Sequence, residues 1–378
     1  MPQTETGLAE DLLAELAQWV RLETPTTHPA AVNRLMDVAQ AELAAAGALI
    51  TRIPGRDGFG DTLVARTPGP AAPDGKSILV SGHLDTVWDP GTIETMPYRI
   101  DGAKAHGPGI YDMKAGSFLA LHVLRSILRQ GVPTRRPITL LLTPDEEVGS
   151  PTSREHIERE AARAACVLIP EPAGAGGACV TARKGVGRFV LRVEGRGAHA
   201  GNGFADGASA VVELAHQIQA IHALVDTGRG ITLNAAPVWG GTRPNVIPPE
   251  AGCEIDLRVA TEADGVALEA ALAGLVACTP GCRVTVEGGM NRPPFAETPA
   301  IAALYETARA IAAGVGIDLP KQSRGGGSDG NFTAALGVPT LDGLGCPGGG
   351  AHVLSEHIRW KQLAPRAALL AGLLETLE

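Results

Sequence analysis

The middle of the chain changes its rhythm of strand and helix patterns, and this change limits the possible folds more than any other feature. The patterns there predict a strand, a helix, two successive strands, a helix and a strand, over residues 189–193, 207–225, 231–239, 253–259, 262–277 and 283–286. This β-α-β-β-α-β order is typical of the split βαβ sandwich, which folds as a self-contained α+β domain. We therefore expect a complete small domain in the middle of the chain.

The patterns on either side indicate one larger domain built from both ends of the chain. Helical periodicity is present over 9–22, 31–45 and 115–129, and short apolar runs suited to buried strands occur at 77–80, 138–142 and 167–169. A sheet covered by helices, in the α/β class, accounts for this order. Patterns of both kinds resume at Pro299. We predict a large domain over 1–180 and 290–378 and an inserted domain over 181–289, which suits a length of 378 residues.

Composition argues against several classes of partner. The chain has 32 basic and 41 acidic residues, a net charge of −9 and no run rich in Lys or Arg, so neither nucleic acid nor an anionic membrane is an expected partner. Its beginning is acidic and amphipathic, unlike a signal peptide, and no apolar stretch approaches the ~20 residues of a membrane span. We therefore expect a cytoplasmic protein whose six cysteines are thiols.

The first chemical signal follows the predicted strand at 77–80. His83 and Asp85 lie two residues apart, so their side chains share a face at the carboxyl end of a strand, where open α/β sheets place their sites. A metal-bound imidazole commonly donates its second N–H to a carboxylate, which Asp85 could accept. A helix-capping Asp beside an incidental His explains the pair equally well.

A second signal is the acidic run after the predicted strand at 138–142. Asp145, Glu146 and Glu147 are consecutive, and adjacent carboxylates repel one another unless water or a cation compensates their charge. A solvated loop and a cation site are both open interpretations of this run.

Three further residues complete the inventory. Glu171 follows the third strand, Asp112 precedes the helix at 115–129, and His352 lies in a glycine-rich loop. For Asp112 alone, an N-cap is the simplest role. Together, however, two His and several carboxylates placed after strands suit a divalent metal with nitrogen and oxygen ligands, with zinc the first choice.

Five motifs, in this order, resemble those of the co-catalytic two-zinc exopeptidases and aminoacylases. They are GHLDTV (82–87), GPGIYDMKAG (107–116), DEEVGS (145–150), the EP pair (171–172) and GAHVLSE (350–356). The family includes carboxypeptidase G (glutamate carboxypeptidase), which the chain resembles most, acetylornithine deacetylase, succinyl-diaminopimelate desuccinylase and the aminoacylases. The match covers nearly the whole chain. It implies a catalytic domain with helices on both faces of a mixed sheet, interrupted by a ferredoxin-like lid and dimerisation domain.

The resemblance implies a role for each motif residue in binding metal. His83 and Glu171 would complete one zinc site, and Glu147 and His352 the other, while Asp112 would bridge both. Two Zn²⁺ per subunit are expected, and Co²⁺ or Mn²⁺ could take their place. The peptide bond after the bridging aspartate, Asp112–Met113, is expected to be cis.

The resemblance also implies catalytic roles. Asp85 would orient His83, and Glu146 would act as the general base that takes a proton from water and delivers it to the leaving amine. In the inserted domain, His199 would stabilise the oxyanion in the active site of a partner subunit, and Asn245 would help to bind substrate. A homodimer formed through the inserted domain is therefore expected. Without the resemblance, an exposed loop histidine and a turn-forming asparagine are the simpler interpretations.

Specificity rests on fewer residues. Arg258 and Arg292 match arginines that face the glutamate carboxylates in carboxypeptidase G, and a guanidinium fork suits that task. Gly327 would contact the substrate carboxylate through its backbone. Arg324 departs from carboxypeptidase G, which has a small polar residue there, so glutamate is less well supported than hydrolysis.

We therefore predict a hydrolase that acts on a small molecule and releases a C-terminal amino acid, with glutamate as the best candidate, from N-acyl, peptide or folate-like substrates. The alternatives are a deacylase of the acetylornithine or succinyl-diaminopimelate type, a dipeptidase, and a catalytically inactive ligand-binding protein. A nucleotide enzyme is disfavoured because no G-x-x-x-x-G-K-[ST] loop occurs, and a serine hydrolase because the sequence indicates no general-base partner for Ser209.

Overall fold

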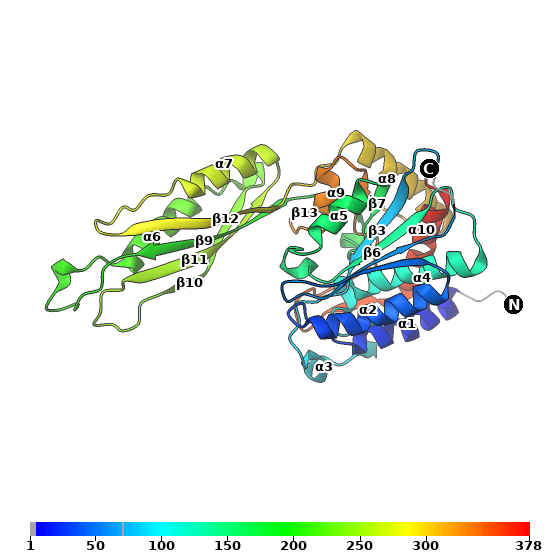
Figure 1. The fold of residues 1–378 in the computed structure, drawn as a ribbon, viewed down its shortest axis with the longest axis horizontal. Helices are drawn as coiled ribbons and strands as arrows, with labels where there is room; N and C mark the ends of the chain where they lie inside the picture. The colour runs from blue at the N-terminus through cyan, green and yellow to red at the C-terminus, as the bar shows by residue number, and fades with distance from the viewer. Residues whose placement is uncertain (1–4, 70–71) are drawn as a thin grey trace. The chain divides into compact units, whose positions relative to one another are not determined.

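The computed structural model describes residues 5–69 and 72–378, which form two compact units (Figure 1). Unit 1 takes in the chain up to Ala182 together with Glu297–Ser323 and Ser328–Glu378, and unit 2 takes in Arg183–Ala296 and Arg324–Gly327. The inserted unit thus ends at Ala296 rather than at 289, because its last strand is longer than predicted. A second short segment, which the sequence pattern does not indicate, also belongs to it.

In unit 1, helices and strands are interspersed along the chain. Its helices are α1 (Glu5–Arg21), α2 (Pro29–Ala45), α3 (Thr92–Thr95), α4 (Ala115–Gln130), α5 (Arg154–Ala161), α8 (Pro299–Gly314), α9 (Gly330–Ala335) and α10 (Leu363–Thr376). Its strands are β1 (Leu49–Ile53), β2 (Thr62–Arg66), β3 (Ser77–His83), β4 (Arg99–Asp101), β5 (Lys104–His106), β6 (Ile138–Thr143), β7 (Ala164–Leu168), β14 (Thr340–Leu341), β15 (Gly348–Gly349) and β16 (His357–Arg359). Two more strands, β8 (Cys179–Arg183) and β13 (Lys321–Arg324), pair with each other where the chain passes between units.

A mixed sheet forms the centre of unit 1, with the strand order β1-β2-β6-β3-β7-β14. Strands β6, β3, β7 and β14 run parallel, and β2 and β1 continue the sheet in antiparallel fashion. Helices cover both faces, with α2 and α4 on one side and α5 and α9 on the other (Figure 1). This arrangement confirms the predicted fold class, a mixed α/β sheet with helices on both faces.

The central strands are apolar because both of their faces are covered. Every residue of β6 is buried. On one face Leu79 and Leu141 pack with Ile157 of α5 and Phe332 of α9. Since β3, β6 and β7 are parallel, their carboxyl ends meet at one edge of the sheet, and His83 is the last residue of β3.

Unit 2 has the predicted β-α-β-β-α-β order. Its elements are β9 (Gly185–Glu194), α6 (Ala210–His222), β10 (Thr232–Gly240), β11 (Glu250–Val259), α7 (Glu262–Ala273) and β12 (Arg283–Arg292). The strands form an antiparallel sheet in the order β10-β11-β9-β12. Leu214 of α6 and Leu272 of α7 pack with Leu191 and Leu257 of the sheet, which gives unit 2 a core of its own.

The predicted limits of several elements in unit 2 need correction, and the structural reason is clear for three of them. Helix α6 begins at Ala210 rather than at Gly207, because the Ser209 hydroxyl accepts a hydrogen bond from the N–H of Val212 and caps the helix there. Helix α7 ends at Ala273 rather than at 277, next to Gly274. Strand β12 runs to Arg292 rather than to 286 and crosses Gly288, whose φ of 125° and close approach to the Arg188 carbonyl require glycine.

Two further expectations concern the whole chain. Among the helices that the structure describes, none is both long enough and apolar enough to cross a bilayer. The cysteines are free thiols, as expected, and Cys166, Cys179, Cys253 and Cys346 are buried.

Candidate metal centre

Acidic and imidazole side chains from several segments of unit 1 converge at the carboxyl edge of the central sheet. His83 ends β3, Glu146 and Glu147 lie in a short 3₁₀ turn after β6, Glu171 follows β7, Asp112 lies in a π-helical turn directly before α4, and His352 lies in the loop before β16. The structure therefore brings together all of the residues predicted to bind metal, from positions far apart in the sequence.

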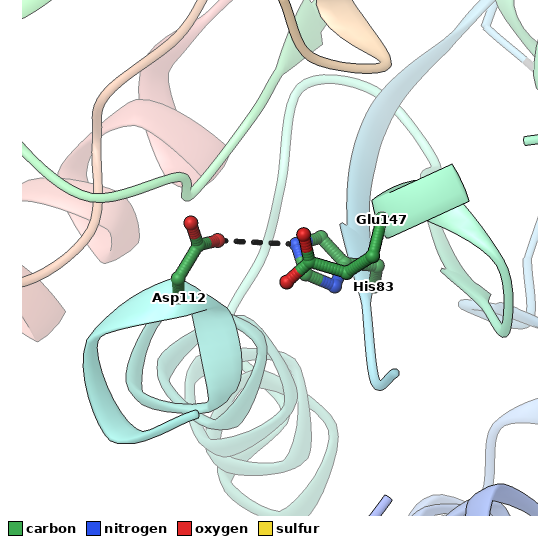
Figure 2. A group of neighbouring side chains, drawn as sticks. All are labelled: His83, Asp112 and Glu147. Carbon is green, nitrogen blue, oxygen red and sulfur yellow. Dashed lines mark ion pairs between the residues drawn. The ribbon is translucent and has the colours of Figure 1, made fainter. Parts of the chain in front are cut away.

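Asp112 lies between two imidazoles. Its Oδ1 is 3.3 Å from Nε2 of His83, and its Oδ2 is 3.3 Å from Nε2 of His352. Figure 2 shows Asp112 extending from the turn before α4 toward His83, with Glu147 beside the imidazole. One carboxylate that faces a different imidazole with each oxygen has the arrangement of a ligand shared between two cations.

Each imidazole also has a glutamate beside it. Glu171 Oε1 is 3.6 Å from Nε2 of His83, and Glu147 Oε2 is 3.3 Å from Nε2 of His352. Glu146 Oε2 lies 4.0 Å from Nε2 of His83. The ligand atoms of His83, Asp112 and Glu147 lie within 4.8 Å of one another, and so do those of His83, Glu146 and Glu171.

The donor atoms of this cluster fit divalent cations. Nε2 of His83 and Oε1 of Glu147 are buried and make no hydrogen bond, which is costly for polar atoms unless another partner binds them. Burial and the charge of Asp112 raise the pKa of Glu147 to about 8. The carboxylates of Asp112 and Glu147 raise the pKa of His352 to about 10, outweighing its partial burial. Both shifts reflect a concentration of negative charge that a bound cation would compensate.

Asp85 has a larger structural role than the predicted one. His83 Nδ1 lies 3.0 Å from the main-chain carbonyl of Asp85 and 3.4 Å from its carboxylate. If Nδ1 carries the proton and donates it there, Nε2 keeps its lone pair for a metal. The Asp85 carboxylate, fully buried, also accepts hydrogen bonds from the N–H groups of Glu146 and Glu147 and from the Thr26 hydroxyl. Asp85 therefore fixes the backbone of the acidic turn as well as the imidazole.

Helix α4 holds two of the converging segments. The Ser117 hydroxyl donates to the carbonyl of His83 at 2.8 Å. A Cβ on Gly116 would collide with the carbonyl of Pro170, so glycine is what lets the first turn of α4 approach the segment that carries Glu171. Gly116, the last residue of the GPGIYDMKAG motif, is therefore required for close packing at this point.

Glu356 is a contributor that the residue patterns did not identify. Its buried carboxylate accepts hydrogen bonds from the N–H groups of Gly109, Tyr111 and Asp112 and from the indole of Trp88, at 2.8–3.0 Å. It thereby holds the turn that presents Asp112. Its only signal in the sequence is its place as the last residue of the GAHVLSE motif, because a lone Glu in a loop reveals nothing about distant N–H groups.

The solvated-loop interpretation of the acidic run is wrong. Asp145 is buried, where it accepts hydrogen bonds from the N–H groups of Thr152 and Ser153 and from both of their hydroxyls. Burial raises its pKa, although these hydrogen bonds oppose the shift. The side chains of Glu146 and Glu147 are only 11% and 5% exposed. The three carboxylates therefore point to different partners and do not share one solvated surface.

The N-cap interpretation of Asp112 is also wrong. The cap position of α4 is occupied by Lys114, which makes no capping hydrogen bond with its side chain, and Asp112 lies in the turn before it with non-helical dihedral angles. The Asp112–Met113 peptide is cis, as expected. His352 adopts a positive φ of 62°, which is uncommon for a residue other than glycine and costs ~1–2 kcal/mol.

The remaining predicted site residues belong to unit 2. His199 and Asn245 are exposed and lie on neighbouring segments, joined by the Ala200 N–H to Asn245 carbonyl hydrogen bond of 3.0 Å. His199 Nδ1 accepts hydrogen bonds from the N–H groups of Gly201 and Asn202, both at 3.1 Å. In the neutral tautomer that fits these two hydrogen bonds, the proton of the ring is on Nε2.

The arginines of unit 2 have different surroundings. Arg292 is buried, and a Cβ on Gly327 would lie 2.8 Å from its Cδ, so Gly327 packs directly on this side chain. Arg183 donates to the carbonyl oxygens of Gly326 and Gly327 and holds their backbone. Arg258, by contrast, makes two 2.7 Å hydrogen bonds to Asp256 on its own strand.

Comparison with known proteins gives consistent matches. The profile of Peptidase family M20/M25/M40 matches residues 79–376. Carboxypeptidase G2 from Pseudomonas sp. (strain RS-16) is 31% identical over 358 residues, covering 93% of this chain and 85% of that protein. The succinyl-diaminopimelate desuccinylase from Acidovorax ebreus is 26% identical over 325 residues, covering 80% of each chain.

A solved structure supports the same fold. The aminopeptidase PepT from Bacillus cereus superposes with a TM-score of 0.75 at 23% sequence identity, covering 97% of this chain and 98% of that chain.

Proposed function

Because the chain belongs to peptidase family M20/M25/M40, we propose that it is a metal-dependent hydrolase that releases a C-terminal amino acid. It would cleave the amide bond that joins this amino acid, with glutamate as the best candidate, to an N-acyl, peptide or folate-like group. The observation that carries the proposal is Asp112, whose two carboxylate oxygens face the imidazoles of His83 and His352 at the same distance of 3.3 Å. That arrangement suits two cations that share a ligand.

The proposed metal ligands divide into two groups around Asp112. His83 and Glu171 would hold one Zn²⁺, and Glu147 and His352 the other, with Co²⁺ or Mn²⁺ as possible substitutes. When bound, such a pair of cations polarises the scissile carbonyl and lowers the pKa of water. The unsatisfied Nε2 of His83 and Oε1 of Glu147 support this assignment.

Glu146 is the proposed general base. It would take a proton from the attacking water and deliver it to the leaving amine. Its carboxylate lies at the edge of the cluster, 4.0 Å from His83 Nε2, while its backbone N–H is fixed by Asp85. Because its backbone is held in this way, Glu146 can accept and release a proton while the residue stays in place.

The substrate proposal rests on unit 2 and on the relatives. Arg292 is buried against Gly327, so the arginine and the neighbouring backbone can bind one carboxylate together. A carboxypeptidase is among the relatives, but so are succinyl-diaminopimelate desuccinylases and an acetylornithine deacetylase. A deacylase of those types is therefore the second candidate, and it would use the same metal chemistry.

Unit 2 is the proposed lid and dimerisation domain. Its edge strand β10 and helix α6 expose Val238, Trp239, Val211 and Val212. Exposed apolar residues beside a free strand edge are typical of a surface that pairs with another chain. We propose that a homodimer forms here, that His199 of one subunit stabilises the oxyanion formed in the other, and that Asn245 assists substrate binding.

The proposed compartment is the cytoplasm, with a small-molecule substrate and neither nucleic acid nor membrane as a partner. The free cysteines support a reducing compartment, and the net charge of −9 disfavours polyanionic partners.

A substrate panel tests the proposed activity. The zinc-loaded protein would be assayed with methotrexate, N-acetyl-glutamate, N-acetyl-ornithine, succinyl-diaminopimelate and simple dipeptides, with and without chelator. We expect chelator-sensitive release of glutamate from methotrexate or N-acetyl-glutamate. Turnover of another compound alone would support the deacylase or the dipeptidase as the function in place of the carboxypeptidase. Silence across the panel with both metals bound would favour the inactive ligand-binding protein.

A pair of arginine variants tests the carboxylate pocket. Arg292→Lys should lower kcat/KM for N-acetyl-glutamate relative to N-acetyl-alanine by ~10-fold or more, since a hydrogen bond to a charged group is worth ~1.5–3 kcal/mol. Arg258→Lys is the matched control, because Arg258 is tied to Asp256. A larger selectivity loss for Arg258→Lys would show that the pocket is assigned to the wrong arginine.

Sedimentation tests the dimer. The wild type should sediment as a dimer, and Val212→Glu, an exposed change on α6, should shift it toward monomer and reduce turnover. A fully active monomer would contradict the shared role of His199.

A further inference from the structure

A cavity of about 450 Å³ lies in unit 1, and none of the proposed metal ligands lines it. Its walls come from the Gly176–Gly177 turn, the Val315–Asp318 segment after α8, Pro347, and the first turn of α10. Its volume falls in the range of small-molecule sites, ~300–1,000 Å³. Exposed residues at its rim leave it open to solvent.

The floor of this cavity carries a buried charge. Arg366 of α10 lines the cavity and is only 2% exposed. A guanidinium has five N–H donors and stays charged at all physiological pH values. One nitrogen, Nη2, donates to the carbonyl of Gly177, whereas Nε and Nη1 are buried and make no hydrogen bond with any residue that the structure describes. A buried cation with unused donors is strongly unfavourable unless an anion pairs with it.

The described part of the chain supplies no such anion. Throughout residues 5–69 and 72–378, no carboxylate forms an ion pair with Arg366, and the first turn of α10 contains no acidic residue. The ionisable groups whose fields reach it are the thiols of Cys346 and Cys179. Burial raises the pKa of each of these thiols to about 12, so both are neutral near pH 7.

We propose that this cavity binds a small oxyanion, a phosphate or carboxylate group, through the guanidinium of Arg366. Nη2 carries a second N–H besides the one that Gly177 accepts, and a charge-assisted hydrogen bond from it suits either group. At the rim, Arg359 is exposed and adds positive charge, while Asp318 is exposed and opposes it. The site is separate from the proposed metal centre and does not depend on the proposed reaction.

Calorimetric titration of the metal-loaded protein with inorganic phosphate, and in parallel with acetate, tests the proposal at low ionic strength. We expect saturable binding of at least one of them, and a ~10-fold or greater loss of affinity in Arg366→Met. Binding of phosphate alone assigns a phosphate group, and binding of acetate alone assigns a carboxylate. Phosphate held at the metal centre would be unaffected by Arg366→Met. Equal affinity in that variant, or no saturable binding of either anion to the wild type, would overturn the proposal.

Rim variants keep the test decisive if Arg366→Met does not fold. Arg359→Gln should weaken anion binding ~2- to 5-fold, and Asp318→Asn should strengthen it by a similar factor, because exposed charges contribute ~0.2–1 kcal/mol. These opposite shifts are expected if the anion lies within a Debye length of both side chains. Shifts of the same sign, or no shift in either variant, would place the anion elsewhere.

Discussion

At the scale of single residues, three consecutive carboxylates do different work because their side chains meet different partners. Asp145 is enclosed by hydroxyl and N–H groups, Glu147 lies 3.3 Å from His352, and Glu146 remains at the edge of the cluster. Under the proposed mechanism, Asp145 thus anchors the turn, Glu147 binds metal and Glu146 carries the proton.

This division predicts the behaviour of two variants. Glu146→Gln should retain both metals but lose ~10²–10⁴-fold in kcat, because it keeps the shape of the side chain and removes its basicity. His83→Ala should instead lose metal, since Nε2 of His83 lies closest to Asp112 and Glu171. Turnover and metal content of both purified variants provide the measurement. Near-normal turnover of Glu146→Gln would contradict its role as base.

Glu356 predicts an effect on metal affinity without contact to metal. Glu356→Gln keeps one accepting oxygen but turns an NH₂ group toward N–H donors of the Gly109–Asp112 turn. We expect metal affinity to fall ~10- to 100-fold while circular dichroism stays unchanged. Trp88→Phe is the control, because it removes only one of the four hydrogen bonds. Wild-type affinity in a chelator competition would refute the positioning role of Glu356.

The residues that bear chemistry could be proposed from the sequence because they stand in recognisable motifs. What the sequence could not reveal is how buried groups pair across long separations. Asp85 supports the Glu146–Glu147 backbone, and Glu356 supports a turn 244 to 247 positions earlier in the chain. Such pairings depend on three-dimensional packing, which has no periodicity along the chain.

At the scale of elements, local patterns predicted the central helices and strands well, and the ends poorly. The buried strands β3, β6 and β7 and the helices α2 and α4 were evident because their apolar residues recur at a fixed period. The edge strand β1 was not predicted, since its mixed burial gives no such signal, and the interior strand β2 was missed as well because its apolar run is short. Strand β12 was cut short at Gly288, because glycine normally indicates a turn.

One helix of unit 2 predicts a pH-dependent stability. Glu213 of α6 is buried and accepts hydrogen bonds from the N–H groups of Cys278 and Thr279, in the turn after α7, and from the Gln217 amide. Although burial opposes it, these bonds lower the pKa of Glu213 from 4.5 to about 2. Its stabilisation is therefore complete above pH 4.5 and is lost as the pH falls toward 2.

Glu213→Gln should accordingly destabilise unit 2 by ~1.5–3 kcal/mol at pH 7. The difference from wild type should shrink as the pH falls below 4.5. Urea unfolding followed at several pH values from 7 to 3 measures both effects. A difference that stays constant over this range would mean that the charge of Glu213 does not contribute.

At the scale of the whole molecule, the two units have separate cores, and all of the proposed metal ligands belong to unit 1. Removal of metal should therefore act on one unit. A ligand present at 1,000 times its Kd stabilises the folded form by ~4 kcal/mol. This corresponds to a melting shift on the order of 10 °C for a domain of this size.

Differential scanning calorimetry with and without chelator checks this prediction. We expect two transitions, of which the one assigned to unit 1 moves down on chelation and returns when Zn²⁺ is restored. The isolated segment 183–296 provides a reference for the transition of unit 2. Equal shifts of both transitions would show that the metals stabilise the molecule as a single cooperative body.

The discontinuous path of unit 1 has a consequence for synthesis on the ribosome. Strand β14 pairs in parallel with β7, yet Leu341 follows Leu168 by 173 positions, and His352 comes later still. At ~5–20 residues per second, roughly 10–35 s of translation separate the two halves of that pairing. During this interval unit 2 has emerged in full, while the nascent chain still lacks the last sheet strand and the second imidazole. Under the proposed ligand assignment, newly made copies can therefore acquire their full complement of metal only near the end of translation.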